Sequence, residues 1–193
     1  MKKFFINSEL FIKLCVLTFC VLLLLPFEWL LLWMSVISLC FIAFKKNKVL
    51  LNDSLSNSTD IYVAPVTGKV VSIDFKSEKV IYEIEMNSFT NFGLYLPCSA
   101  KVECIEKNGK NILIEFINKL NKTTRIIIKD SKFFTRPHIW PKVGDKGRVS
   151  ANFGFVPFGG IVKVELDKDI NQLVTVGDRV FAGSSPLAGI KGN

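Results

Sequence analysis

The feature that most constrains this chain is a long apolar segment near its N-terminus. Between Leu14 and Phe44 the only charged residue is Glu28. Each of the two arms on either side of Glu28 is shorter than the ~20 apolar residues that a helix needs to cross a bilayer. Pro26 disfavours one continuous helix through the middle. We therefore predict an α-helical membrane hairpin over residues 1–48, with two short helices and a turn near Pro26–Glu28; a single tilted span is the alternative.

Lysines flank the apolar segment at both ends, at positions 2, 3 and 13 before it and 45, 46 and 48 after it. Positive charge on both sides predicts that both ends face the cytoplasm. A cleaved signal peptide fits poorly, because the apolar stretch is too long and no small-residue cleavage site follows it. The expected location is a bacterial inner membrane, with the rest of the chain on its cytoplasmic side.

The net charge of the chain is +8. The first 44 residues hold three lysines and two glutamates, so +7 of that charge lies after them. A basic domain tethered close to a membrane is attracted to anionic lipid. Its basic residues are scattered and no aromatic-basic motif recurs, so nucleic acid is not an expected partner. Membrane phospholipid is the expected one.

After a polar linker at residues 49–60, short β-branched and aromatic runs separated by turn residues extend over residues 61–193. Such runs predict strands, and no long helical periodicity competes with them. The predicted strands cover residues 62–65, 69–73, 80–85, 111–116, 125–128 and 161–166. The second part of the chain is therefore expected to be a mainly β domain.

Metal binding and the common catalytic motifs are not indicated. The chain has five cysteines, and Cys98 and Cys104 are the two that follow the apolar segment. Their spacing fits neither a zinc site nor a disulfide framework, so reduced thiols are expected. No Walker loop, Gly-x-Ser-x-Gly or His-Glu-x-x-His sequence is present.

Two internal similarities indicate how the β domain is built. Residues 64–70 (APVTGKV) return as residues 96–102 (LPCSAKV), and residues 143–146 (VGDK) return as residues 176–179 (VGDR). Turn-strand signatures of this kind are typical of barrel-sandwich hybrids, the fold of lipoyl and biotinyl carriers. The carriers also need a modified lysine in a Met-Lys-Met or Asp-Lys-Ala sequence, which this chain lacks. The sequence thus predicts the fold without the carrier function.

Several of these motifs, in this order behind this apolar segment, resemble the short, membrane-anchored phosphatidylserine decarboxylases. Residues 64–70 resemble the family's Ala-Pro-Ala-Asp-Gly-Lys-Val segment, and residues 86–102 its Met-Ser-Pro-Phe-Asp-Val-His segment with the turn that follows. Residues 144–160 match the family's spacing from Gly-Asp to Phe-Gly-Ser, here Phe-Gly-Gly, and residues 163–188 match its closing hairpin. The resemblance implies a phosphatidylserine-decarboxylase-like β domain.

The same resemblance implies a self-cleaving site that this chain does not complete. In the family, a serine attacks the preceding carbonyl and becomes a pyruvoyl cofactor, a histidine takes its proton and an aspartate orients the histidine. The aspartate position falls on Thr67, the histidine position on Phe92 and the serine position, which would carry the pyruvoyl group, on Gly160. None of these side chains can do the corresponding chemistry, so no catalytic residue and no cofactor is expected.

Substitutes for the missing groups are weak. His138 is the sole histidine and lies outside the expected motif, and cleavage at Gly183–Ser184 would leave a very short second chain. We therefore expect a catalytically degenerate relative of the family that binds phospholipid or a protein partner in phospholipid metabolism, or that forms a homo-oligomer. One alternative is a divergent active decarboxylase that makes phosphatidylethanolamine. Another is a barrel-sandwich adaptor protein, which the cytoplasmic orientation disfavours.

Overall fold

The computed structural model describes residues 61–190 except 77, 88–90, 110 and 130–135, together with residues 13, 16, 17, 20 and 32–39 of the apolar segment. The chain divides into two compact units, residues 1–47 and 48–193. Residues 32–39 are helical, as are the four single positions. No helix within these described positions is long and apolar enough to cross a membrane. The predicted hairpin turn at Pro26–Glu28 and the predicted linker lie outside the described residues, so the helical hairpin is unsupported there and stays a prediction.

The second unit is built from strands, which confirms the mainly β prediction. The long strands are β2 (Gly68–Lys76), β3 (Lys79–Glu85), β5 (Ala100–Asn108), β6 (Asn111–Asn118), β7 (Thr123–Lys129) and β11 (Ile161–Asp167). The short strands are β1 (Ile61–Val63), β4 (Gly93–Tyr95), β8 (His138–Ile139), β9 (Lys146–Gly147), β10 (Asn152–Phe155), β12 (Ile170–Gln172), β13 (Arg179–Val180) and β14 (Pro186–Ile190). Five of the six predicted runs fall wholly within a strand and the run 62–65 overlaps β1 at its first two residues, whereas β5 and most of the short strands were not predicted as runs.

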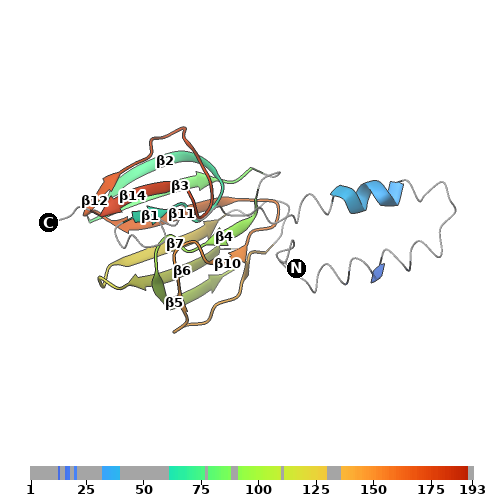
Figure 1. Cartoon of the computed structure of the whole chain (residues 1–193), viewed down its shortest axis with the longest axis horizontal. Helices are drawn as coiled ribbons and strands as arrows, with labels where there is room; N and C mark the ends of the chain where they lie inside the picture. Colours follow the sequence, from blue (N-terminus) through green and yellow to red (C-terminus); the bar gives the residue numbers. More distant parts are fainter. Residues whose placement is uncertain are drawn as a thin grey trace. The chain divides into compact units, whose positions relative to one another are not determined.

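These strands form one large sheet and two small ones. The order of the large sheet is β13-β2-β3-β11-β7-β6-β5-β9, and the small sheets have the orders β1-β14-β12 and β4-β10-β8. Figure 1 shows β2 and β3 on one side of the domain and β5 and β6 on the other, with β11 and β7 between them. Every pairing of neighbouring strands is antiparallel.

This arrangement is an internal repeat. The first repeat consists of β1–β3 and β11–β14, and the second repeat, β4–β10, is inserted between them. The two repeats interlock reciprocally, because the Val63 N–H donates to the Pro97 carbonyl and the Tyr95 N–H donates to the Pro65 carbonyl, both at 2.9 Å. The sheet orders are mirrored as well, since β13-β2-β3-β11 on one side corresponds to β9-β5-β6-β7 on the other.

The internal sequence similarity between residues 143–146 and 176–179 marks turns whose backbone conformation restricts which residues can stand there. Gly144 and Gly177 have φ values of +96° and +102°, a left-handed conformation that favours glycine. Each donates its N–H at 2.8 Å to the carbonyl of a valine in the neighbouring long strand, Val102 for Gly144 and Val70 for Gly177. The aspartate that follows each glycine accepts a backbone N–H at the start of its turn, at 2.8 Å and 2.7 Å.

The hydrophobic core fills both repeats with different combinations of side chains. Buried and exposed residues alternate along β6, β7 and β11, as expected for strands with one face in the core. In the second repeat Leu96 packs where Gly147 leaves room, because a Cβ at Gly147 would collide with the Leu96 side chain. The equivalent pair in the first repeat is Ala64 and Val180, both buried. A large residue and a small one have thus exchanged places between the repeats.

The repeats differ where β3 and β11 meet. In the second repeat β6 and β7 are consecutive, joined by the short turn of residues 119–122. Their counterparts β3 and β11 are paired over their whole length but are far apart in sequence. The chain leaves the end of β3 towards β4, and it returns from β10 through residues 156–160 to start β11. The two repeats are therefore connected at this one end of the sheet, and the residues named by the family resemblance lie there.

Candidate functional site

The structure brings two of the three predicted site residues to the junction between the repeats and places the third at the same end of the sheet. Gly160 directly precedes β11, and its carbonyl accepts the N–H of Met86, which directly follows β3, at 2.9 Å. Thr67 directly precedes β2. Since β2 and β11 both run antiparallel to β3, Thr67 and Gly160 lie on either side of the end of β3.

Phe92 belongs to the same junction. Its side chain is only 2% exposed, and its ring centroid is 6.2 Å from that of Phe158. The Phe92 carbonyl also accepts the Val156 N–H at 2.8 Å. Phe92 is therefore packed against the segment that leads into Gly160. Within the described part of the chain, no hydrogen bond connects Thr67 to either Phe92 or Gly160.

The Thr67 hydroxyl has a structural partner that the repeat duplicates. Its Oγ1 accepts the N–H of Ala182 at 3.0 Å. At the equivalent place in the second repeat, the Ser99 Oγ accepts the N–H of Val149 at 3.1 Å. Both hydroxyls satisfy a backbone donor of a buried residue that would otherwise lack a partner. The interaction gives the hydroxyl of Thr67 a structural role in the turn.

The Phe158–Gly160 stretch also has a counterpart in the second repeat, the turn between β6 and β7. The Met86–Gly160 hydrogen bond matches that from the Asn118 N–H to the Lys122 carbonyl, which is 3.1 Å long. The residue before each acceptor has a left-handed backbone, with φ +82° at Gly159 and +55° at Asn121. The turn therefore requires a left-handed residue, a conformation that glycine adopts readily, and Gly160 takes the place that a lysine occupies in the other repeat.

Phe158 departs from this shared geometry. It has φ +58°, an uncommon conformation for a bulky residue. Strained backbone of this kind persists only where the surroundings enforce it, and it is often found at functional sites. Sequence reasoning identified Phe158 as part of the Phe-Gly-Gly motif but gave no indication of its strain. Met86 also belongs to a sequence motif, but the motif gave no indication that Met86 would be the hydrogen-bond partner of Gly160.

Four buried positions beside the junction carry apolar side chains, in contrast to the equivalent positions of the other repeat. Beside the β6–β7 turn the buried residues include Tyr62, Cys98, Asn118 and Thr124, and the Asn118 Nδ2 donates to the Tyr62 hydroxyl at 3.3 Å. Burial raises the pKa of Cys98 to about 11 and, together with the Coulombic effect of that thiol, the pKa of Tyr62 to about 12. The corresponding residues beside the junction are Val66, Met86, Leu94 and Val162, all buried.

The three predicted positions carry neither a basic nitrogen nor a carboxylate, and Thr67 has the only hydroxyl among them. Gly160 has no side chain, the Phe92 ring has no basic nitrogen, and the Thr67 hydroxyl is already an acceptor for Ala182. Among the described residues, no group of three or more His, Cys, Asp or Glu side chains could hold a metal ion.

The two alternative residues, His138 and Ser184, lie outside the three predicted positions, and each makes a structural contact. The His138 ring is exposed and stacks on the Phe155 ring at a centroid distance of 4.9 Å. Ser184 lies in a tight turn, where its N–H and its hydroxyl both donate to the Phe181 carbonyl, at 3.2 and 3.3 Å. His138 pairs with Phe155, which directly precedes the junction segment of residues 156–160, whereas no contact among the described residues connects Ser184 to Phe92 or Gly160.

The fold and the site define a mainly β domain made of two interlocked repeats. Comparison with known proteins indicates which family it resembles. The chain is 29% identical over 149 residues to a phosphatidylserine decarboxylase proenzyme of Syntrophus aciditrophicus, covering 66% of this chain and 70% of that protein. It is 28% identical over 162 residues to the protein of that name from Syntrophotalea carbinolica, covering 72% and 76%. A third, from Porphyromonas gingivalis, is 28% identical over 133 residues, covering 58% and 60%. No protein-family model matches the chain. These distant relatives support the resemblance to the phosphatidylserine decarboxylase family.

Proposed function

We propose that this chain is a catalytically degenerate relative of phosphatidylserine decarboxylase, which binds phospholipid at a membrane and does not decarboxylate it. The observation that carries the proposal is the junction itself. It keeps the family's Phe-Gly sequence and its position before a strand, but the third residue is Gly160. A pyruvoyl group derives from a serine side chain, and glycine offers neither a nucleophile nor a group that could be eliminated.

The surroundings of Gly160 support the same reading. Self-cleavage would need a base to take the proton of the nucleophile and a carboxylate to orient that base. Phe92 is buried against Phe158 where the base is expected. Thr67, where the carboxylate is expected, holds the backbone of Ala182, as Ser99 holds Val149 in the other repeat. The positions of the nucleophile, the base and the orienting carboxylate are thus occupied by residues that contribute to packing or to turn geometry.

The proposed setting follows from the rest of the chain. The apolar segment would form a helical hairpin in a bacterial inner membrane, with a β domain of the barrel-sandwich type on the cytoplasmic side. The +7 charge after residue 44 would attract that domain to anionic lipid. A protein partner in phospholipid metabolism, or a second copy of the chain, would be further candidates for binding at the apolar junction.

The decisive experiment is an intact-mass measurement on the full chain purified from its membrane. We expect one chain near 21.8 kDa, and no carbon dioxide release from phosphatidylserine above that of a blank. Two chains, the smaller with a blocked N-terminus, together with formation of phosphatidylethanolamine, would establish a divergent active decarboxylase instead.

The Gly160→Ser variant is the matched control, because it restores the nucleophile without the base. We expect this variant also to stay uncut, since Phe92 cannot accept a proton. Cleavage of the Gly160→Ser chain would mean that another residue acts as the base, and it would contradict the assignment of Phe92 to the histidine position.

A further inference from the structure

The segment of residues 136–148, which we call the β8–β9 segment, combines an exposed tryptophan with a concentration of positive charge. Trp140 is 44% exposed and Val143, at the tip of the following turn, is 63% exposed. Four basic residues and one acidic residue give the segment a net charge of +3, with all four basic side chains exposed: Arg136, Lys142, Lys146 and Arg148. Exposed tryptophan beside basic residues is typical of surfaces that contact the headgroup region of a membrane.

The internal repeat shows that the fold does not require this composition. The equivalent segment of the first repeat, residues 169–181, contains the corresponding strands and the same Gly-Asp turn. It holds two aspartates and one arginine, a net charge of −1. Leu173 stands in place of Trp140, and Thr175 in place of Lys142. Since both segments fold alike, the tryptophan and the excess of basic residues in the β8–β9 segment are not explained by structure.

The positive charges of the β8–β9 segment have no carboxylate partner among the described residues. None of its four basic side chains forms an ion pair in the part of the chain that the structure describes. Its one carboxylate, that of Asp145, accepts the Lys142 backbone N–H at 2.8 Å and closes the turn. The basic groups are therefore available to an external anion.

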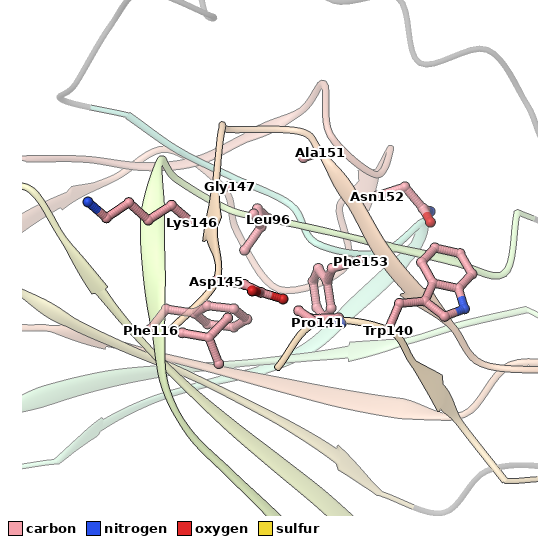
Figure 2. Close-up of a pocket in the computed structure, with 11 residues that line it drawn as sticks. Leu96, Phe116, Trp140, Pro141, Asp145, Lys146, Gly147, Ala151, Asn152 and Phe153 are labelled. Atoms are coloured by element: carbon pink, nitrogen blue, oxygen red, sulfur yellow. The ribbon is translucent and has the colours of Figure 1, made fainter. Parts of the chain in front are cut away.

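Trp140 and Lys146 lie on opposite sides of a depression of about 360 Å³ (Figure 2). Much of its lining is apolar, with Leu96, Phe116 and Phe153 contributing side chains. The Asp145 carboxylate also belongs to this lining (Figure 2). The depression therefore combines apolar side chains with an aromatic ring and one charged group of each sign.

We propose that the β8–β9 segment is the surface by which the β domain contacts an anionic phospholipid bilayer. The Trp140 ring lies at the level of the headgroups, and Lys142, Lys146 and Arg148 face the lipid phosphates. This inference rests on the proposed association with phospholipid and specifies the surface that makes it. The exposed apolar residues of the other segment, Leu173, Val176 and Phe181, lack the accompanying positive charge and do not form the contact.

The experiment places a single tryptophan at equivalent positions of the two repeats. The chain has three tryptophans, so the substitutions Trp29→Phe and Trp33→Phe leave Trp140 as the only one. The full chain is reconstituted into vesicles of brominated phosphatidylcholine, with or without anionic phosphatidylglycerol. We expect Trp140 fluorescence to be quenched in the anionic vesicles, less in the neutral ones, and less again as salt is raised.

The matched control moves the reporter to the other repeat by adding Trp140→Leu and Leu173→Trp. We expect at most a small fraction of the quenching at this position. Equal quenching at positions 140 and 173, or none at 140, would overturn the proposal. A response of Trp140 to a short single-stranded oligonucleotide, with none to anionic vesicles, would overturn it in favour of a nucleic-acid surface.

Charge reversal tests the electrostatic part. Lys142→Glu and Lys146→Glu, made together, should abolish the difference between anionic and neutral vesicles, whereas Lys168→Glu, at an exposed position of the first repeat, should preserve most of it. These outcomes are independent of self-cleavage. A chain that proves to be cut and active would refute the proposed loss of catalysis and leave the quenching result unaffected, and a failure of quenching would leave the intact-mass result unaffected.

Discussion

The two repeats of the β domain have the same strands and turns but differ in what they bury at equivalent ends. The β6–β7 end of the second repeat encloses Tyr62, Cys98, Asn118 and Thr124. At the equivalent positions, the β3–β11 end, where the chain crosses between the repeats, has Leu94, Val66, Met86 and Val162. Features shared by both ends, such as a left-handed residue in the turn, are therefore demands of the fold. Features found at only one end indicate what this particular chain does with the fold.

The largest expected effect concerns the exchanged pair in the core. Leu96→Ala should lower the free energy of unfolding by roughly 2–5 kcal/mol, because Leu96 is 4% exposed and its loss leaves a cavity. Gly147→Val should cost roughly 1–3 kcal/mol by overpacking against Leu96. The double variant recreates the Ala64–Val180 combination of the first repeat, so its cost should be clearly smaller than the sum of the two single costs.

Urea unfolding of the full chain in detergent measures all three variants, followed by Trp140 fluorescence in the background of Trp29→Phe and Trp33→Phe. Cys104→Ala, at a half-exposed position outside the core, is the control and should change the midpoint little. If the cost of the double variant equalled the sum of the two single costs, the Leu96–Gly147 and Ala64–Val180 pairs would not be equivalent in packing. The exchange of a large and a small residue would then not explain why the two repeats differ in sequence there.

The second comparison concerns the buried thiol, which has Val66 at its equivalent position. Burial raises the pKa of Cys98 from 9.0 to about 11. The unfolded chain therefore ionises first, and the stability that comes from keeping the thiol neutral is complete below pH 9 and lost as the pH rises towards 11. That loss is at most roughly 3 kcal/mol. Cys98→Val should remove it, so that the alkaline decline begins nearer pH 10, where unfolded tyrosine ionises. An unchanged profile between pH 9 and 11 would argue against this origin.

The third comparison concerns the two turn hydroxyls. Thr67→Val should cost roughly 1–3 kcal/mol, because the Ala182 N–H loses its acceptor in a buried setting. Ser99→Ala should have a similar cost through Val149, and Thr67→Ser should have little. The readout is the urea midpoint of the full chain. If Thr67→Val proved neutral while Ser99→Ala did not, the hydroxyl at position 67 would need an explanation other than the turn.

Much of the fold could be predicted from the sequence because its signals are local. β-branched runs predicted six strands, and the repeated Gly-Asp turns reflect a backbone conformation that few residues other than glycine adopt. The short strands β8 and β9 were missed because two residues cannot show an alternating pattern. The full extent of the repeat was missed for another reason: Leu96–Gly147 and Ala64–Val180 solve the same packing problem with different residues, which hides their equivalence in the sequence.

The candidate site could be located from the sequence but not explained by it. Motif order identified Thr67, Phe92 and Gly160, and the structure places all three at one end of the sheet. The sequence could not provide the contacts that these residues make. The bond between Thr67 and Ala182 joins residues far apart in the chain, and the packing of Phe92 on Phe158 depends on a strained backbone that no composition or spacing reveals.

The smallest expected effect concerns the turn that contains the candidate site. Gly159→Ala should cost about 1 kcal/mol, because alanine at φ +82° is strained and its Cβ would lie 3.0 Å from the Met86 carbonyl oxygen. Asn121→Gly, at the equivalent left-handed position, should change the urea midpoint little, since glycine adopts that conformation readily but also loses more entropy on folding. A larger cost for Asn121→Gly than for Gly159→Ala would contradict the equivalence of the two turns. It would mean that Gly159 is retained for a role in binding that the backbone geometry does not account for.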